Sequence, residues 1–166
     1  MRPTIGITTY HTFADWRGWR EEGALLPWTY VKSIRDSGGT LHQHVPDLVG
    51  HEVHSGPADG FGRHKVRVIA GELLRGILPG GEYFDVPTHH HQAVDEVGAG
   101  LTAVGWADDG IIEAVESDSV EQFLIGVQWH PEQGDDLRLF SALVAAADIH
   151  SSEREVASLP SLLADA

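Results

Sequence analysis

The stretch over residues 123–129 constrains the fold more than any other part of this chain. Apart from Gln128, its side chains are apolar on both faces of an extended strand. Such a strand has to be covered on both sides, as the interior strands of α/β sheets are. The strand leads into His130, and open α/β sheets place their reactive groups at the carboxyl ends of their strands. The sequence therefore predicts an α/β fold with His130 at its functional edge.

A second strong pattern predicts a β-hairpin. Residues 101–107 and 111–115 are strand-like and flank Asp108-Asp109-Gly110, a turn in which glycine tolerates positive φ. Hydrophobic periodicity and breaker residues define the other elements. We expect strands at residues 3–9, 64–69 and 83–87, helices at 28–37 and 71–77, and a loop over 40–62.

The length of 166 residues fits a single domain. We expect that domain to occupy residues 1–150, and the acidic stretch 151–166 to form a C-terminal tail or one more helix. A chain of this length buries roughly two thirds of its unfolded surface, and a hydrophobic content of 42% supplies the core. Asp135 is placed to cap the closing helix, whose apolar stripe comprises Leu137, Phe140, Val144 and Ala147.

Charge and composition exclude several classes of function. The chain has 11 Lys and Arg against 25 Asp and Glu, for a formal net charge of -14. Such a field repels phosphate backbones and anionic lipids, so we expect neither nucleic acid nor membrane as a partner. No apolar run approaches the length of a membrane span, and we expect a cytoplasmic protein. The chain has no cysteine, which excludes disulfides, thiolate metal sites and a cysteine nucleophile.

The turn after the apolar strand carries a candidate proton-transfer pair. The imidazole of His130 can accept a proton near neutral pH, and the carboxylate of Glu132, two residues on, can hold its tautomer and orientation. By itself this spacing is equally compatible with a histidine on a surface loop.

Three motifs, in order along the chain, carry a resemblance to a known family: residues 86–94 (VPTHHHQAV), 109–114 (DGIIEA) and 126–132 (GVQWHPE). They resemble motifs of the class I glutamine amidotransferase-like proteins, in the γ-glutamyl-γ-aminobutyrate hydrolase branch. The resemblance covers most of residues 3–147. It implies an α/β, flavodoxin-like three-layer sandwich with a mostly parallel sheet and an antiparallel hairpin.

The resemblance also implies site residues. The last motif closes the Cys-His-Glu triad of that family, so His130 would be the general base and Glu132 its orienting carboxylate. His90, His91 and Gln92 would lie on the side of a small γ-glutamyl substrate, although they are equally compatible with a polar loop beside the crevice. No cofactor is implied, and we expect no metal site.

The chain departs from the family pattern at Gly38-Gly39. In the family, one glycine pair ends the first helix and a separate pair opens a Gly-Gly-Thr-Leu-x-Gln motif, whereas here one pair does both. The intervening block would carry the oxyanion loop and the cysteine elbow, so we expect an internal deletion at about residues 38–40. The fold would then lack some central strands, and the chain would be inactive as written.

Two alternatives and one consequence accompany that expectation. In the first alternative Thr8, Ser37 or Thr40 is a substitute nucleophile, but a hydroxyl is a poorer nucleophile than a thiolate and no elbow presents it. In the second the chain is a non-catalytic binding module that binds a metal through its histidine-rich loops. Unpaired strand edges left by lost strands would favour marginal solubility or a homo-oligomer.

Overall fold

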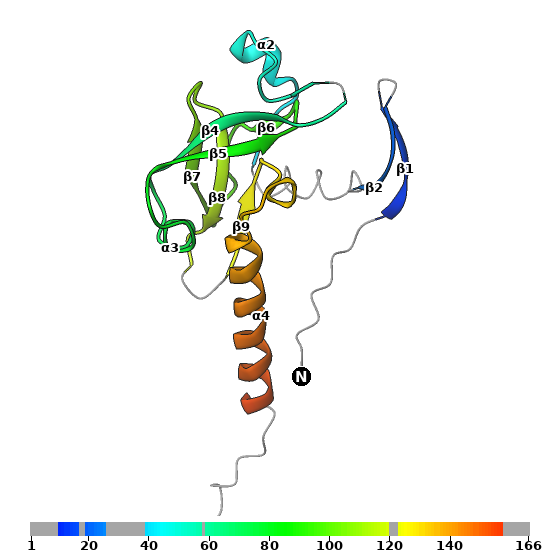
Figure 1. Cartoon of the computed structure of the whole chain (residues 1–166). Coiled ribbons are helices and arrows are strands. Elements are labelled where there is room, and N and C mark those ends of the chain that lie inside the picture. The colour runs from blue at the N-terminus through cyan, green and yellow to red at the C-terminus, as the bar shows by residue number, and fades with distance from the viewer. Residues whose placement is uncertain (1–9, 17–18, 26–38, 58, 120–122, 158–166) are drawn as a thin grey trace, which may run out of the picture.

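The computed structural model describes residues 10–16, 19–25, 39–57, 59–119 and 123–157 (Figure 1). The strand predicted at 3–9 and the helix predicted at 28–37 lie outside these residues. The described elements in chain order are β1 (Tyr10–Trp16), β2 (Trp19–Leu25), β3 (Leu41–His42), α2 (Val45–Val49), β4 (Gly62–Val68), α3 (Leu73–Ile77), β5 (Tyr83–Thr88), β6 (Ala93–Val94), β7 (Leu101–Ala107), β8 (Ile112–Ser117), β9 (Ile125–Val127), η1 (Pro131–Gln133) and α4 (Arg138–Ala157).

The main sheet has seven strands in the order β3-β6-β8-β7-β4-β5, with β9 also paired to β8. Strands β1 and β2 form a separate two-stranded sheet. Every ladder between described strands is antiparallel, so the predominance of parallel pairs expected from the sequence does not extend to these residues. The reason lies in the connections: parallel neighbours need a crossover of about a dozen or more residues, usually a helix, whereas tight turns give antiparallel pairs.

The predicted hairpin is confirmed as β7 and β8. Its turn residue Gly110 has φ 89, the left-handed conformation that glycine adopts at no steric cost. Along its other edge β8 pairs first with β6, at Ile112, and then with β9, from Ala114 to Glu116. Strand β8 is therefore the centre of the sheet.

The strands predicted at 64–69 and 83–87 correspond to β4 and β5, and the helix at 71–77 to α3. The loop predicted over 40–62 was only partly right, because it contains β3 and α2. Pro46 lies in the first turn of α2, and Gly50 closes it at φ 78. Pro at the start and Gly at the end of a short apolar run is a helix signal that the sequence does carry.

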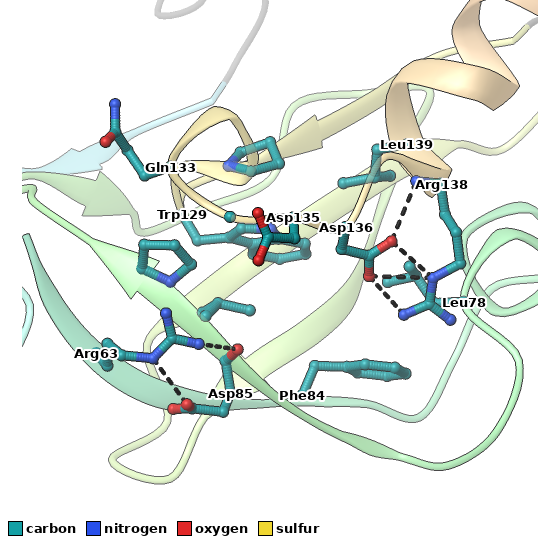
Figure 2. Close-up of a pocket in the computed structure, with 14 residues that line it drawn as sticks. Arg63, Leu78, Phe84, Asp85, Trp129, Gln133, Asp135, Asp136, Arg138 and Leu139 are labelled. Carbon is teal, nitrogen blue, oxygen red and sulfur yellow. Dashed lines mark hydrogen bonds and ion pairs between the residues drawn. The ribbon is translucent and has the colours of Figure 1, made fainter.

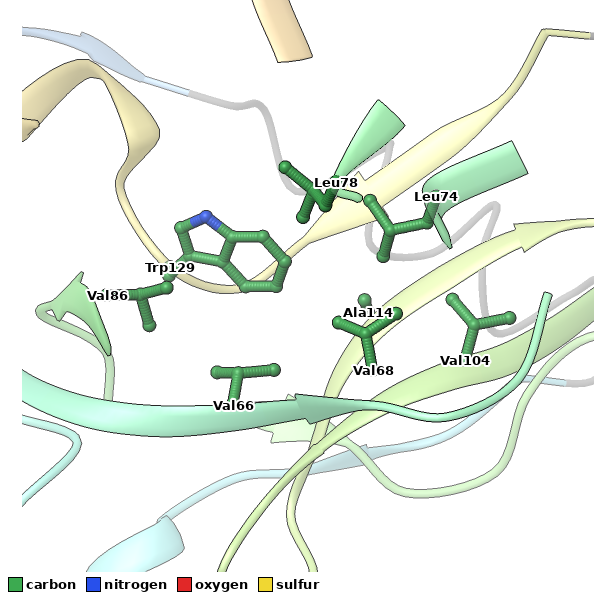
Figure 3. Close-up of a cluster of buried hydrophobic side chains, with 8 residues drawn as sticks. All are labelled: Val66, Val68, Leu74, Leu78, Val86, Val104, Ala114 and Trp129. Atoms are coloured by element: carbon green, nitrogen blue, oxygen red, sulfur yellow. The ribbon is translucent and has the colours of Figure 1, made fainter. Parts of the chain in front are cut away.

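The core lies between the sheet and α3. Trp129, 6% exposed, is its largest side chain and sits beside Leu78 and Val86 (Figure 3). The other members of this core are Val66, Val68, Leu74, Val104 and Ala114. A second, smaller cluster under α2 comprises Val45, Ala93, Ala107 and Ile111.

Two predictions about the C-terminal part were wrong in detail. Strand β9 covers only residues 125–127 and pairs with a single described strand, β8, so it is not an interior strand of the described sheet. The backbone N–H of Arg138 donates to Asp136 at 3.1 Å, so Asp136 rather than Asp135 caps the start of α4. The chain continues as one helix through Ala157, without a break near Ser151.

Helix α4 projects away from the sheet (Figure 1). The apolar stripe predicted on it is mostly exposed, with Leu137, Phe140 and Val144 at 63%, 39% and 44%. Leu139 does pack against the core. None of the described helices has both the length and the apolar character needed to cross a membrane.

A buried carboxylate joins β8 to α3. Glu116 is 7% exposed and accepts hydrogen bonds from the backbone N–H groups of Glu72 and Leu74, each at 2.9 Å. These donors belong to the first turn of α3, where backbone N–H groups have no partner within the helix. The backbone at Gly71 lies so close to the Glu116 carboxylate that a Cβ atom at position 71 would be 2.5 Å from Glu116 Oε1. Glu116 therefore fixes α3 on the sheet.

We expect Glu116→Ala to lower the free energy of unfolding by about 1–3 kcal/mol, because it leaves one buried and one part-buried N–H group without an acceptor. Urea denaturation measures this loss. The control is Glu82→Ala, which removes an exposed carboxylate paired with Arg67 and should cost about 0–1 kcal/mol. Equal losses in the two variants would contradict the role given to Glu116.

Candidate functional site

The turn after β9 positions His130. Its backbone N–H donates to the carbonyl of Pro87 at 2.9 Å, which ties the turn to the end of β5. Its Nδ1 lies 2.6 Å from Oε1 of Glu132, in η1. An ionised carboxylate only accepts hydrogen bonds, so Nδ1 carries the proton and Nε2 presents a lone pair. The two predicted residues therefore have the relation required of a general base and its orienting group.

The surroundings of His130 are partly aromatic. The ring of Phe61 meets it edge-on at a centroid distance of 4.8 Å, and Phe61 also contacts His89 at 5.6 Å. Of the hydroxyls considered as substitute nucleophiles, Thr40 donates to Asp95 Oδ2 at 2.9 Å. Thr40 is thereby engaged in linking two chain segments, and Thr8 and Ser37 lie outside the described residues.

The loop after β5 carries His90, His91 and Gln92, and these three residues lie in different surroundings. The carbonyl of Gln92 accepts from the side chain of Gln128 at 3.3 Å, and its own amide donates to Gln43 at 2.9 Å. His91 lies near the ring of His44. Gln92 is thus held beside the strand that leads to His130, whereas the carbonyl of His91 accepts from the backbone N–H of Val45 in α2 at 2.7 Å. The ring of His90 instead enters a buried cluster.

A cavity of about 410 Å³ borders the same turn (Figure 2). Trp129 and Pro131 line it, but His130 is not among its lining residues. Two ion pairs border it: Arg63 Nε with Asp85 Oδ2 at 2.8 Å, and Arg138 with Asp136. The other lining residues are Leu78, Phe84, Val86, Pro87, Gln133, Gly134, Asp135 and Leu139.

Three histidines and one glutamate meet inside the protein. His54, His64, His90 and Glu113 each present one nitrogen or oxygen, and these four atoms lie within 4.8 Å of one another. From Glu113 Oε1 the distances are 3.1 Å to His54 Nδ1, 3.5 Å to His64 Nε2 and 3.3 Å to His90 Nε2. The side chains of Glu113 and His54 are 0% and 1% exposed, and those of His64 and His90 are 7% and 12% exposed.

The outer nitrogen of each ring has its own partner. His54 Nε2 lies 2.8 Å from Asp109 Oδ2 in the β7–β8 turn. His64 Nδ1 lies 3.2 Å from the carbonyl of Lys65, and His90 Nδ1 lies 2.9 Å from the carbonyl of Gln92. Within the described residues, the three inner nitrogens and both carboxylate oxygens of Glu113 make no hydrogen bond of good geometry. Their contacts are the three ion-pair distances from Glu113 Oε1.

Burial and charge pull the pKa values of this cluster in opposite directions. Burial lowers the pKa of His54, but Glu113 and Asp109 outweigh it and hold that pKa above its usual value. Burial prevails at His64, whose pKa is lowered. Burial would raise the pKa values of Asp109 and Glu113, yet their histidine partners, His54 first, hold both below the usual range.

Sequence reasoning did not single out His64 or Glu113 as site residues. The available signal was a carboxylate inside the apolar run of β8. There Ile112 pairs with Trp106 and Ala114 with Gly105, so Glu113 is the extra residue of a β-bulge. Bulges re-aim side chains, and this one allows Glu113 and Ala114 to be buried in succession.

The hydrogen bond between His130 and Glu132 predicts that His130 is mainly the Nδ1-protonated tautomer when neutral. Nitrogen-15 NMR of the imidazole distinguishes this form from the Nε2-protonated one. Glu132→Ala should shift His130 toward the Nε2-protonated form that free imidazole side chains favour, while Glu96→Ala, on a distant exposed segment, should leave it unchanged. An Nε2-protonated His130 in the unaltered chain would contradict the geometry.

The chain is similar to one protein family and to several known proteins. The family model described as peptidase C26 matches residues 33–132, which include both the histidine cluster and the His130 turn. The protein named "Putative glutamine amidotransferase Rv2859c" of Mycobacterium tuberculosis is 46% identical over 121 residues, 72% of this chain and 38% of that protein. The γ-glutamyl-γ-aminobutyrate hydrolase PuuD of Escherichia coli is 30% identical over 135 residues, 72% of this chain and 51% of that protein.

The chain thus spans 38% and 51% of the length of these two relatives. A solved structure, "putative gmp synthase subunit a protein" from Thermoplasma acidophilum, matches with a TM-score of 0.53 at 14% identity and covers 74% of this chain and 55% of that one. At this identity the likeness shows the fold alone. It confirms the α/β, flavodoxin-type class, of which the described residues are a part.

Proposed function

This chain belongs to the peptidase C26 family, and from that membership we propose that it is a γ-glutamyl hydrolase homologue that keeps the proton-transfer part of a Cys-His-Glu triad without its nucleophile. His130 is the general base and Glu132 its orienting carboxylate. The observation that carries the proposal is their 2.6 Å contact in a chain that contains no cysteine.

The substrate side of the proposal rests on the loop after β5. The carbonyl of Gln92 accepts a hydrogen bond from the side chain of Gln128, two residues before His130. The loop after β5 and the proposed base therefore lie on the same edge of the sheet. We assign His91 and Gln92 to the contacts with a small γ-glutamyl compound. The name of the Escherichia coli relative, γ-glutamyl-γ-aminobutyrate hydrolase, supports that class of ligand.

The absent nucleophile determines the activity we propose. Removing a triad nucleophile costs about 10⁶ in turnover in a well-studied enzyme, and loss of one oxyanion donor costs about 10²–10³ more. A base with nothing to activate leaves the γ-glutamyl amide bond intact. The block carrying the cysteine would have been lost between Gly38 and Thr40, which accords with the short span of this chain on its relatives.

We expect the chain to release no p-nitroaniline from γ-glutamyl-p-nitroanilide above the rate in buffer. His130→Ala should leave that background unchanged, because the base acts on no nucleophile. Absorbance at high enzyme concentration measures the release, with the Escherichia coli hydrolase as the positive control. Turnover that disappears in His130→Ala would overturn the proposal, as would resequencing of the gene that restores a cysteine-containing block.

The proposed partner besides a small ligand is a second copy of this chain. The exposed apolar side chains of α4 support self-association, since Phe140 and Ile149 are 39% and 61% exposed along the helix and Leu137, directly before it, is 63% exposed. Covering such surface against another copy removes it from water.

Light scattering coupled to size exclusion should therefore give a mass above that of one chain, 18.0 kDa. The double variant Leu137→Glu, Val144→Glu should lower the mass toward a monomer, because it places charges on the apolar face. A matched polar change on the same helix, Asp148→Asn, should keep the larger mass. A monodisperse monomer for the unaltered chain would refute self-association.

A further inference from the structure

We propose that His54, His64, His90 and Glu113 form a binding site for a divalent transition metal, with Zn²⁺ the best-suited ion. This inference does not depend on the hydrolase proposal, because none of the four residues belongs to the His130 pair. The ligands are His54 Nδ1, His64 Nε2, His90 Nε2 and a carboxylate oxygen of Glu113.

The spacing of the donor atoms fits one ion. Zinc bonds to nitrogen and oxygen of ~2.0–2.1 Å place neighbouring ligands of a tetrahedral site about 3.4 Å apart. The three contacts of Glu113 Oε1 measure 3.1, 3.5 and 3.3 Å. The remaining pairs of donor atoms lie within 4.8 Å of one another, and the site is complete when the rings close around the ion toward the tetrahedral spacing.

The hydrogen bonds around the site indicate where the ring protons lie. His54 donates outward to Asp109, His64 to the carbonyl of Lys65, and His90 to the carbonyl of Gln92. A neutral imidazole that donates from one nitrogen presents a lone pair on the other. When all three rings are neutral, three lone pairs face the carboxylate of Glu113 in a buried space. A bound cation turns that repulsion into attraction and contacts every inner atom at once.

The same outer contacts are those of metal-binding histidines. A metal-ligating imidazole commonly donates its other N–H to a carboxylate or a backbone carbonyl, which fixes the ring. Asp109 supplies the carboxylate for His54, and Ile111 N–H in turn donates to Asp109 Oδ1 at 3.2 Å. The site therefore has an ordered second layer as well as four ligands.

The donor set and the burial identify the kind of site. Three imidazoles and one carboxylate suit zinc and its neighbours, whereas Ca²⁺ and Mg²⁺ prefer all-oxygen sites. All four side chains are at most 12% exposed, which leaves no open position for substrate water. Four protein ligands and a closed site are typical of structural zinc.

Such an ion would join four separate segments: the loop before β4, β4 itself, the loop after β5 and the bulge of β8. The loop after β5 continues from His90 into His91 and Gln92. Binding at His90 therefore restrains the loop that carries Gln92, whose carbonyl accepts from Gln128, without involving His130. We place the ion as a stabilising element between these segments.

The full chain, stripped with chelator, tests the site directly. We expect it to take up one equivalent of Zn²⁺ with sub-micromolar Kd in competition with a chromophoric chelator, and to melt at higher temperature with zinc than with EDTA. Co²⁺ should bind in place of Zn²⁺ and give the intense visible absorption of a four-coordinate ion. Weaker than micromolar binding, or a Co²⁺ spectrum of six-coordinate type, would overturn the proposal without recourse to any variant.

Variants then assign the ligands. Glu113→Gln and His64→Gln should each weaken zinc binding by more than 100-fold, and Asp109→Asn by roughly 10–100-fold through loss of its hold on His54. The control is the double variant His42→Gln, His44→Gln, which removes two imidazoles outside the cluster and should keep the Kd within about twofold. Circular dichroism of the metal-free forms checks that each variant folds.

Two outcomes would contradict the assignment. Equal loss of affinity in the His42, His44 control and in the cluster variants would place the zinc on the outer loops. Unaltered affinity in a folded Glu113→Gln or His64→Gln would show that the cluster is a hydrogen-bonded core in which a protonated His54 pairs with Glu113.

Discussion

The burial of the Glu113 carboxylate among three imidazoles is the interaction on which the rest of this structure depends. A carboxylate removed from water at 0% exposure costs several kcal/mol unless charge and hydrogen bonds compensate. The compensation comes from segments far apart in the chain, at residues 54, 64 and 90. The cluster therefore joins the long irregular stretch before β4 and the histidine loop after β5 to the central strand β8.

Strand β8 carries a second buried carboxylate with a different task. Glu113 faces the histidines, and Glu116, three residues later, holds the first turn of α3 through backbone N–H groups. The bulge at Glu113 allows one short strand to serve both the polar cluster and the apolar core around Trp129. Trp129 leads directly into His130, so the packing that buries the indole also sets where the His130–Glu132 pair stands. Fold and candidate site are thus coupled through one strand and its neighbour.

Much of this arrangement was predictable from local patterns. The β7–β8 hairpin follows from its turn residues and flanking apolar runs, and the His130–Glu132 contact follows from a His-Pro-Glu turn after an apolar strand. The pairing of β8 with both β6 and β9 was not predictable, because it is set by contacts across the chain. His64 and Glu113 were not predictable as site residues because their spacing forms no local motif, and only the fold brings them to His54 and His90.

The central claim is that the three imidazoles and Glu113 act together on one cation and so organise the loops beside the His130 turn. X-ray absorption at the zinc edge, on the full chain loaded with one equivalent of metal, tests it most directly. We expect three imidazole nitrogens and one carboxylate oxygen, each at ~2.0–2.1 Å from the zinc. A first shell of oxygen atoms from water, or a spectrum with a single imidazole, would contradict it.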